Sequence, residues 1–343
     1  MEAEIVVHIG AGKTGSSSIQ VFLARNANTL GNLGFLVPDS DLGVGGQVTG
    51  QHVWATQRCI RAADRAGLMS RIEQLVEKAD RKQVVLISAE NLSNVKSHEI
   101  FDEVGRRFRT RAILYIRRQD ELLLSAWQQW FVKVNPELNA WLFKGIRLFG
   151  NWESVITDWE SVIGVGNVAV RLFEKGSFFG DGLLDDFVDA IGLTGQKGQL
   201  DFSTGLINPS LSDVMTSIVE GSTSMFRDIH DNDYYRFVET VMGGAGASDR
   251  KVSLVSRAQR EGLLGYYAAM NARVCARFFP GRKSLFEPID HSKYDYLDET
   301  QMLRRQIQFL NELIYRSAQK TRADAVAAAQ AAIASPPVRQ PGT

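Results

Sequence analysis

The chain has 343 residues, 44% of them hydrophobic and 23% charged, as expected for a globular protein with a substantial core. Lys and Arg number 39, as do Asp and Glu, so a net charge of zero gives no reason to expect nucleic-acid or anionic-membrane binding. Cys59 and Cys275 form neither a zinc nor a disulfide pattern, which fits a reducing compartment. The opening "MEAEIVVHIG" is typical of a first strand, not a signal peptide, and no apolar run could span a bilayer, so we expect a cytoplasmic protein.

Apolar segments typical of buried strands alternate with segments of helical periodicity. The expected strands are residues 4–10, 83–91, 111–119 and 167–174. The expected helices between and after them are residues 16–34, 69–80, 120–134 and 183–193. This alternation predicts an α/β fold with a parallel central sheet and right-handed crossovers.

From about residue 210 the pattern becomes mostly helical, and the amphipathic segment 304–316 suits a surface helix or a homodimer helix. The glycine-rich residues 44–52 predict a mobile loop. We expect one domain over residues 1–317 with helical additions, followed by an alanine-rich helix and a disordered tail over residues 318–343.

A glycine-rich motif follows the first expected strand, in "HIGAGKTGSSSIQ". It is not a Walker A loop, because the first glycine of G-x-x-x-x-G-K-[ST] would fall at Val7, inside the strand. The usual magnesium carboxylate is also missing, since the later strands run into Ala89 and Glu90 or into Arg117 and Arg118. A nucleoside triphosphate enzyme without such a group would leave its transferred charge unneutralised.

The motif is nevertheless a good anion cradle. A strand, a tight glycine turn and serines opening a helix surround one anion with backbone N–H groups, hydroxyls and the helix dipole. The expected anion-binding residues are Gly12, Lys13, Thr14, Gly15, Ser16, Ser17 and Ser18. The alternative is an ordinary glycine turn in which Ser16 caps the helix.

A second cluster lies where the third strand ends, the edge at which open α/β sheets bind ligands. Arg117 stands at this end, and Ser125 follows eight residues later in the next helix. Together they could hold a second phosphate. The alternative is that Arg117 or Arg118 forms a surface ion pair with Asp120 or Glu121.

In this order, the two clusters resemble the bacterial branch of the sulfotransferase family, which uses 3′-phosphoadenosine 5′-phosphosulfate (PAPS). "KTGSSS", from Lys13 to Ser18, is similar to the family's K-T-G-[ST]-[ST]-S loop, which grips the 5′-phosphosulfate. Arg117 and Ser125 match the pair that binds the 3′-phosphate, although Gln119 replaces a frequent proline. Weaker likeness extends over about residues 4–290, including "ISAEN" and "NPSLS", and implies a P-loop-like sulfotransferase architecture with extra C-terminal helices.

The resemblance implies metal-independent, in-line transfer of a sulfuryl group from PAPS to a hydroxyl or amine, releasing 3′-phosphoadenosine 5′-phosphate (PAP). Lys13 would stabilise charge on the leaving 5′-phosphate oxygen. Glu90 follows the second strand, where related cytosolic sulfotransferases carry a catalytic histidine, and is one candidate base; an acid opening a helix is the alternative. His52, after the glycine-rich loop, is the other candidate base. We expect a structural role for His8.

Two other functions remain open: a degenerate phosphate-loop kinase using ATP and magnesium, and a non-catalytic nucleotide-binding protein. Neither a metal site nor a nucleic-acid partner is expected. The acceptor would be a small molecule, a lipid or a glycan, chosen by loops near residues 40–58, 133–150 and 222–250. Asn208 and Ser210 are further candidate lid or cofactor contacts.

Overall fold

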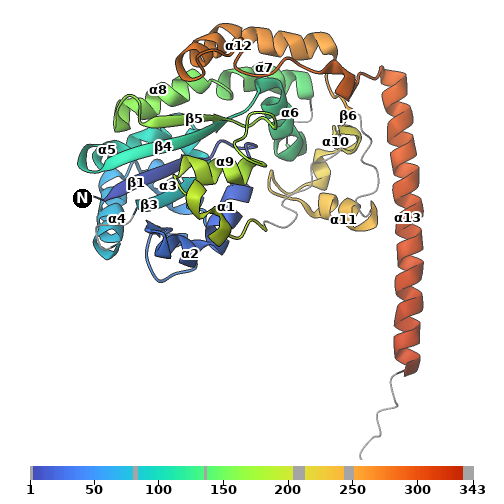
Figure 1. The fold of residues 1–343 in the computed structure, drawn as a ribbon. Helices are drawn as coiled ribbons and strands as arrows, with labels where there is room; N and C mark the ends of the chain where they lie inside the picture. Colours follow the sequence, from blue (N-terminus) through green and yellow to red (C-terminus); the bar gives the residue numbers. More distant parts are fainter. Residues whose placement is uncertain (1–2, 80–83, 135–136, 204–212, 243–250, 335–343) are drawn as a thin grey trace, which may run out of the picture. The chain divides into compact units, whose positions relative to one another are not determined.

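The computed structural model of the protein describes residues 3–79, 84–134, 137–203, 213–242 and 251–334 (Figure 1). The chain divides into two compact units. We call the first the sheet unit; it comprises Met1–Ala126, Leu142–Pro209 and Arg260–Pro288. We call the second the helical unit; it comprises Trp127–Trp141, Ser210–Gln259 and Ile289–Thr343.

The sheet unit is built on a five-stranded sheet in which every neighbouring pair is parallel, in the order β2-β3-β1-β4-β5. Its strands are β1 Glu4–Ile9, β2 Phe35–Leu36, β3 Val84–Ala89, β4 Arg109–Ile116 and β5 Val168–Leu172. In the central register, His8 lies opposite Ser88 on one side and Ile113 on the other. The predicted α/β class with a parallel central sheet is confirmed.

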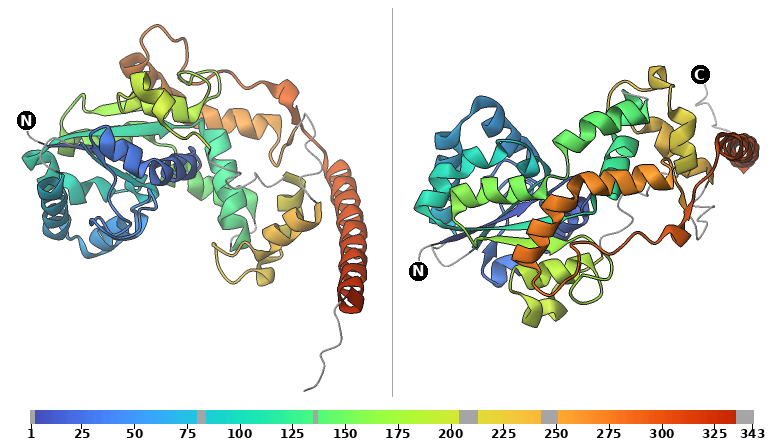
Figure 2. Two further views of the ribbon diagram at one scale, coloured as in Figure 1. Left: turned by 60° about the horizontal axis from the view of Figure 1, so that its bottom comes forward. Right: turned by 90° about the horizontal axis from the view of Figure 1, so that it is seen from above.

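Helices cover both faces of this sheet (Figures 1 and 2). One face packs on α1 Ser16–Arg25, α2 Ala27–Asn32 and α9 Leu183–Ala190, in a core that includes Val6, Phe22, Leu86, Tyr115 and Phe187. On the other side lie α3 Val53–Ala62, α4 Arg65–Lys78, α5 Asp102–Arg107 and α8 Trp152–Ile163. Because both faces are buried, the central strands are near-continuous apolar runs, interrupted by His8 in β1 and Ser88 in β3.

Several predicted helices have different limits. The expected helix over residues 16–34 breaks at Asn26, whose side chain donates to the carbonyls of Phe22 and Asp201. The remaining helices associated with the sheet unit are η1 Glu90–Ser93, η2 Ser97–Phe101, α6 Gln119–Gln129, α7 Leu138–Leu148, η4 Thr194–Gln199 and α12 Arg257–Phe278; α6, α7 and α12 continue into the helical unit.

The helical unit contains the predicted C-terminal helices. Its elements are η3 Phe131–Lys133, α10 Asp213–Val219, η5 Thr223–Met225, α11 Asp233–Met242, β6 Lys251–Val252, η6 His291–Lys293, β7 Tyr294–Asp295 and α13 Glu299–Ala334. A small core joins α10, α11 and α13 through Met215, Tyr235, Val238 and Leu313. The expected boundary between residues 317 and 318 falls inside α13, which is continuous there. The expected tail beyond residue 334 lies outside the described residues.

Candidate functional site

The glycine motif lies at the carboxyl end of β1, in the centre of the sheet. β1 ends at Ile9, residues 10–15 form the loop, and α1 begins at Ser16. The first turn of α1 carries no acidic residue, and its N-cap residue, Gly15, offers no side chain to cap the helix. The first backbone N–H groups of a helix have no acceptor within it. The loop therefore presents an uncapped, electropositive helix terminus at this edge of the sheet.

A single inward-facing carbonyl organises the loop. The carbonyl of Ala11 accepts hydrogen bonds from the backbone N–H of Thr14 at 3.3 Å, from its hydroxyl at 2.6 Å and from the hydroxyl of Ser16 at 3.1 Å. Thr14 and Ser16 are buried. Their hydroxyl protons are thus used inside the loop. Ser17 and Ser18, which are also predicted anion ligands, differ in having half-buried side chains.

Two positions of the loop have left-handed backbone conformations. Lys13 has φ of 67° and Gly15 has φ of 80°. A Cβ at Gly15 would overlap the side chain of Leu183 and come within 2.9 Å of the ring of Phe173. Gly15 is therefore required for both its conformation and its packing. The strained backbone at Lys13 is the kind of feature that concentrates at functional sites.

The structure brings the two predicted phosphate clusters into direct contact. Arg117 follows β4, and its Nη1 donates to the carbonyl of Lys13 at 2.9 Å. The guanidinium also lies over the ring of Phe173, 5.5 Å from its centre. Burial and the neighbouring charge of Arg117 lower the pKa of Lys13, while Glu90 raises it. Three charged groups from three different strand ends therefore meet at the loop.

The surface-pair alternative for Arg117 is also present. Its Nε and Nη2 donate to Oε2 of Glu121 at 3.3 and 3.1 Å. Arg118 donates to Oδ1 of Asp120 at 2.7 Å and to Oε1 of Glu121 at 3.1 Å. A guanidinium has five N–H donors. The two bonds of Arg117 to Glu121 and its bond to the carbonyl of Lys13 use three of them. Arg117 can thus bind an anion in addition to its protein partners.

Glu90 lies beside the loop at the end of β3. It begins η1 and is half-buried, and its carboxylate is hydrogen-bonded by the side chain of Ser17. Burial raises the pKa of Glu90, and the charge of Lys13 together with the Ser17 bond lowers it in part. The α-carbon of Glu90 would lie 3.0 Å from a Cβ at Gly10, so the loop and Glu90 pack closely.

Ser125 is in α6 of the sheet unit, in the helix that begins two residues after Arg117. Its side chain is half-buried. The candidate base, the lysine, the arginine and the half-buried loop serines therefore gather around the loop. Ser125 lies in the second turn of α6.

His52, the other candidate base, is not accessible to a substrate. Its side chain is fully buried, its Nδ1 accepts from the backbone N–H of Ser88 at 3.0 Å, and its Nε2 lies 3.2 Å from the carbonyl of Pro38. A neutral ring with its proton on Nε2 satisfies both contacts. Burial lowers the pKa of His52. The ring thus bridges the chain after β2 to β3, which is a structural arrangement.

His8 is also buried, and its Nδ1 bonds the hydroxyl of Ser88 at 2.8 Å. Burial lowers its pKa to about 3. Its ring packs edge-on against Tyr115 and Phe187. These contacts agree with the structural role expected for His8.

The predicted acceptor loops are described in part. In the segment before α3, the carboxylate of Asp39 accepts backbone N–H groups from Asp41, Gly43 and Gly46. Trp54, in the first turn of α3, is 67% exposed. Asn208 and Ser210 lie outside the described residues, as do residues 135–136 and 243–250 of the other two loops.

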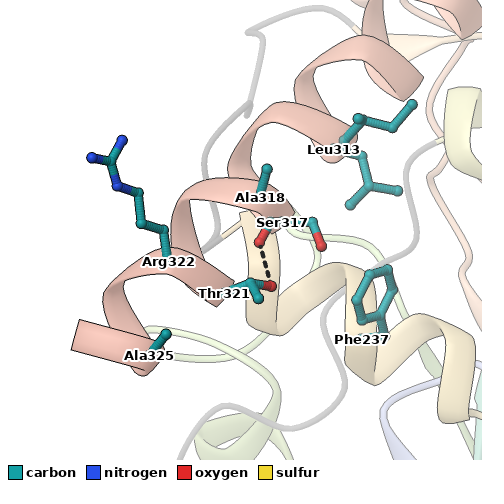
Figure 3. A pocket seen from close by; sticks show the side chains of 8 residues that line it. Phe237, Leu313, Ser317, Ala318, Thr321, Arg322 and Ala325 are labelled. Atoms are coloured by element: carbon teal, nitrogen blue, oxygen red, sulfur yellow. Dashed lines mark hydrogen bonds between the residues drawn. The ribbon is translucent and has the colours of Figure 1, made fainter. Parts of the chain in front are cut away.

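Two hollows of the protein are lined by residues other than the predicted site residues. One, of about 630 Å³, lies between α11 and α13, where Phe237 and Leu313 face each other (Figure 3). Another, of about 410 Å³, lies beside β5 and α9 and is lined by Arg171, Asp186 and Arg282. Across the described residues, no helix is long and apolar enough to cross a membrane, and no group of three or more His, Cys, Asp or Glu is placed to hold a metal ion.

Sequence reasoning missed the carbonyl of Lys13 as a partner of Arg117, and it missed Phe173. The carbonyl carries no signal in a sequence. Phe173 follows β5 directly, at the same sheet edge as the loop, and an apolar residue at a strand end gives no sign of a cation contact.

Comparison with known proteins gives a likeness in structure and none in sequence. No protein-family model matches the chain, and no curated protein matches it by sequence. Among solved structures, it is similar to a sulfotransferase from Alicyclobacillus acidocaldarius, with 14% sequence identity, a TM-score of 0.42, and coverage of 80% of this chain and 94% of the other. An identity and a score of this size assign neither a family nor any site residue.

Proposed function

We propose that the protein is a sulfotransferase that moves a sulfuryl group from PAPS to a hydroxyl or amine of a small-molecule, lipid or glycan acceptor. The observation that carries this proposal is the contact of Arg117 with the carbonyl of Lys13. This contact joins the anion loop that follows β1 to the arginine that follows the neighbouring strand, β4. The two motifs recognised in the sequence therefore lie side by side. Two adjacent anion sites suit a nucleotide with phosphates on both its 5′ and 3′ positions.

The loop would hold the 5′-phosphosulfate. The backbone N–H groups that open α1 and the hydroxyl of Ser18 are its donors, together with the backbone of Gly12, Gly15 and Ser16. Thr14 instead donates to the carbonyl of Ala11, and the hydroxyl of Ser17 is bonded to Glu90. Lys13 would stabilise the negative charge that develops on the leaving phosphate oxygen. Burial and Arg117 lower the pKa of Lys13 and Glu90 raises it, and the same burial strengthens the interaction of Lys13 with that charge.

Arg117 and Ser125 would hold the 3′-phosphate. Arg117 keeps two N–H donors after its bonds to the described residues, the number needed for two phosphate oxygens. Its guanidinium is fixed by the carbonyl of Lys13 and by Phe173, so little conformational entropy is lost on binding.

Glu90 would take the acceptor's proton while the acceptor oxygen or nitrogen bonds to sulfur and the bond from sulfur to the phosphate oxygen breaks. A base works best when its pKa approaches the working pH, and burial moves the pKa of Glu90 in that direction. We assign no proton transfer to His52, because both its ring nitrogens are engaged and its side chain is buried.

A kinase using ATP and magnesium is the less favoured function. The residue that a Walker loop would need as glycine is Val7, which is fully buried within β1. The loop therefore lacks the length that wraps a nucleoside triphosphate. A non-catalytic nucleotide-binding protein could use Lys13 to bind phosphate but would have no need of a base such as Glu90.

The test is a transfer assay with PAPS carrying labelled sulfur and a panel of phenols, sugars and lipids, in buffer containing a chelator. We expect labelled product and release of PAP from the wild type, and at least about 100-fold less product from Lys13→Met. Phosphorylation of the same panel by ATP and magnesium, with no transfer from PAPS, would favour the kinase instead.

A further inference from the structure

The carboxylate of Glu121 lies between two guanidinium groups. Its Oε2 accepts from Nε and Nη2 of Arg117, at 3.3 and 3.1 Å, and its Oε1 accepts from Nη2 of Arg118 at 3.1 Å. Two oxygens of one anion are thus bound by two neighbouring arginines. A phosphate offers oxygens in the same arrangement, with more negative charge.

We call the two guanidinium groups of Arg117 and Arg118 the anion seat. The anion seat would keep its shape without Glu121. Arg117 is held by the carbonyl of Lys13 and by Phe173, neither of which involves Glu121. Arg118 is held by Asp120, whose carboxylate is fully buried. Asp120 is fixed in turn by the buried Arg260, whose Nη1 donates to it at 2.6 Å. The two guanidinium groups therefore remain in place when the carboxylate moves.

Glu121 is the most easily displaced member of the group. Its side chain is 36% exposed, whereas those of Arg117 and Arg118 are 20% and 11% exposed. An exposed carboxylate in a surface ion pair contributes little to stability. A dianionic phosphate on the remaining donors of Arg117 would repel it, because two like charges would then lie against one guanidinium.

We propose that Glu121 fills the anion seat in the free protein and that the 3′-phosphate of the nucleotide displaces it, which makes Arg118 a second ligand of that phosphate. This inference rests on the proposed function. In the free protein Glu121 neutralises the two arginines, and it competes with the nucleotide for them. The competition weakens binding of substrate and product alike and so speeds release of PAP.

The experiment is titration calorimetry of PAP and of ADP into the wild type and three variants. Glu121→Gln removes the competing charge and should tighten PAP binding roughly five- to tenfold, with ADP nearly unchanged because ADP lacks a 3′-phosphate. Arg118→Lys keeps a charge beside Asp120 but loses the second donor, and should weaken PAP and not ADP. Glu153→Gln is the matched control, since Glu153 is 37% exposed and pairs with Arg273.

Tightening is informative because damage to the fold would weaken binding. Equal or weaker PAP binding by Glu121→Gln, with a wild type that prefers PAP to ADP, overturns the inference and leaves the proposed function standing. A wild type with no preference for PAP overturns the proposed function instead. The seat is then judged with inorganic phosphate, which should raise the melting temperature of Glu121→Gln more than that of the wild type; equal shifts refute the seat.

Discussion

The guanidinium of Arg117 donates a hydrogen bond to the main-chain carbonyl of Lys13, across 2.9 Å. The two residues are far apart in the sequence and follow adjacent strands, β1 and β4. The bond sets the spacing between the anion loop and the arginine, which is the spacing between two phosphates if the site holds PAPS.

Lys13→Met should reduce transfer at least about 100-fold, the usual cost of removing one group that stabilises transition-state charge. Stability should change little, because burial and Arg117 both oppose the charge on Lys13 in the folded protein. Methionine keeps an unbranched side chain and removes the ammonium group, and its backbone has the same cost as that of lysine at φ of 67°. Initial rates and thermal unfolding of the same samples separate the two effects. A variant that unfolds at room temperature would show instead that Lys13 is structural.

Glu90→Gln should abolish most transfer without lowering stability at neutral pH. The pKa of Glu90 is raised in the folded state, so its protonated form favours folding, and this contribution is lost as the pH rises through the folded pKa. An uncharged glutamine removes the cost of burying the carboxylate. As the pH falls through the same pKa, the wild-type rate should fall because the base is protonated. A pH–rate profile unchanged in Glu90→Gln would exclude Glu90 as the base.

The folded protein should lose stability in mild acid because of two buried histidines. Burial lowers the pKa of His8 to about 3 and also lowers that of His52. The unfolded chain therefore binds more protons, and stability is lost as the pH falls below the ordinary histidine pKa of about 6.5. For His8 alone the loss is about 2 kcal/mol at pH 5. Urea unfolding at pH 5 and pH 8 measures it, and equal stabilities would contradict this account.

His52→Ala should destabilise the protein by about 2–4 kcal/mol, since it leaves a cavity and unpaired polar groups at Ser88 and Pro38. Its transfer rate should stay close to that of the wild type below the unfolding temperature. His230→Ala, at an exposed position, is the control and should leave stability unchanged. Loss of activity in His52→Ala without loss of stability would restore His52 as a catalytic candidate.

Gly15→Ala should be much more harmful than Gly34→Ala. Both glycines have φ values that cost an alanine about 1–2 kcal/mol, 80° and 88°. A Cβ at Gly34 meets no atom within 4 Å, whereas one at Gly15 overlaps Leu183 and should cost about 1–3 kcal/mol more. Melting temperatures of the two variants measure the difference, and equal values would mean that the loop can shift away from Leu183.

Much of the fold could be predicted from the sequence because parallel strands buried on both faces are near-continuous apolar runs. β2 could not, since it has only two residues and is defined by its pairing with Val84 and Val85. The break at Asn26 depends on its bond to the distant carbonyl of Asp201. The alanine-rich segment expected as a separate helix continues α13 without a break, because alanine favours helix and no glycine or proline intervenes.

The part of the site that could be predicted from the sequence consists of charged side chains that directly follow strands. Lys13, Glu90 and Arg117 meet because the carboxyl ends of adjacent parallel strands share one edge. The geometry of His52 was not predictable, because its partners Ser88 and Pro38 come from other segments. The inward hydroxyls of Thr14 and Ser16 were not predictable either, because they depend on the turn that points the Ala11 carbonyl inward.

The most direct test of the central claim is titration calorimetry of the wild type with PAP, ADP, and ATP with magnesium, repeated on Arg117→Ala. We predict tight, metal-independent binding of PAP, weaker binding of ADP by roughly 1–3 kcal/mol for the lost charged contacts, and loss of that preference in Arg117→Ala. Preference for ATP with magnesium, or a preference for PAP that does not depend on Arg117, would contradict the account.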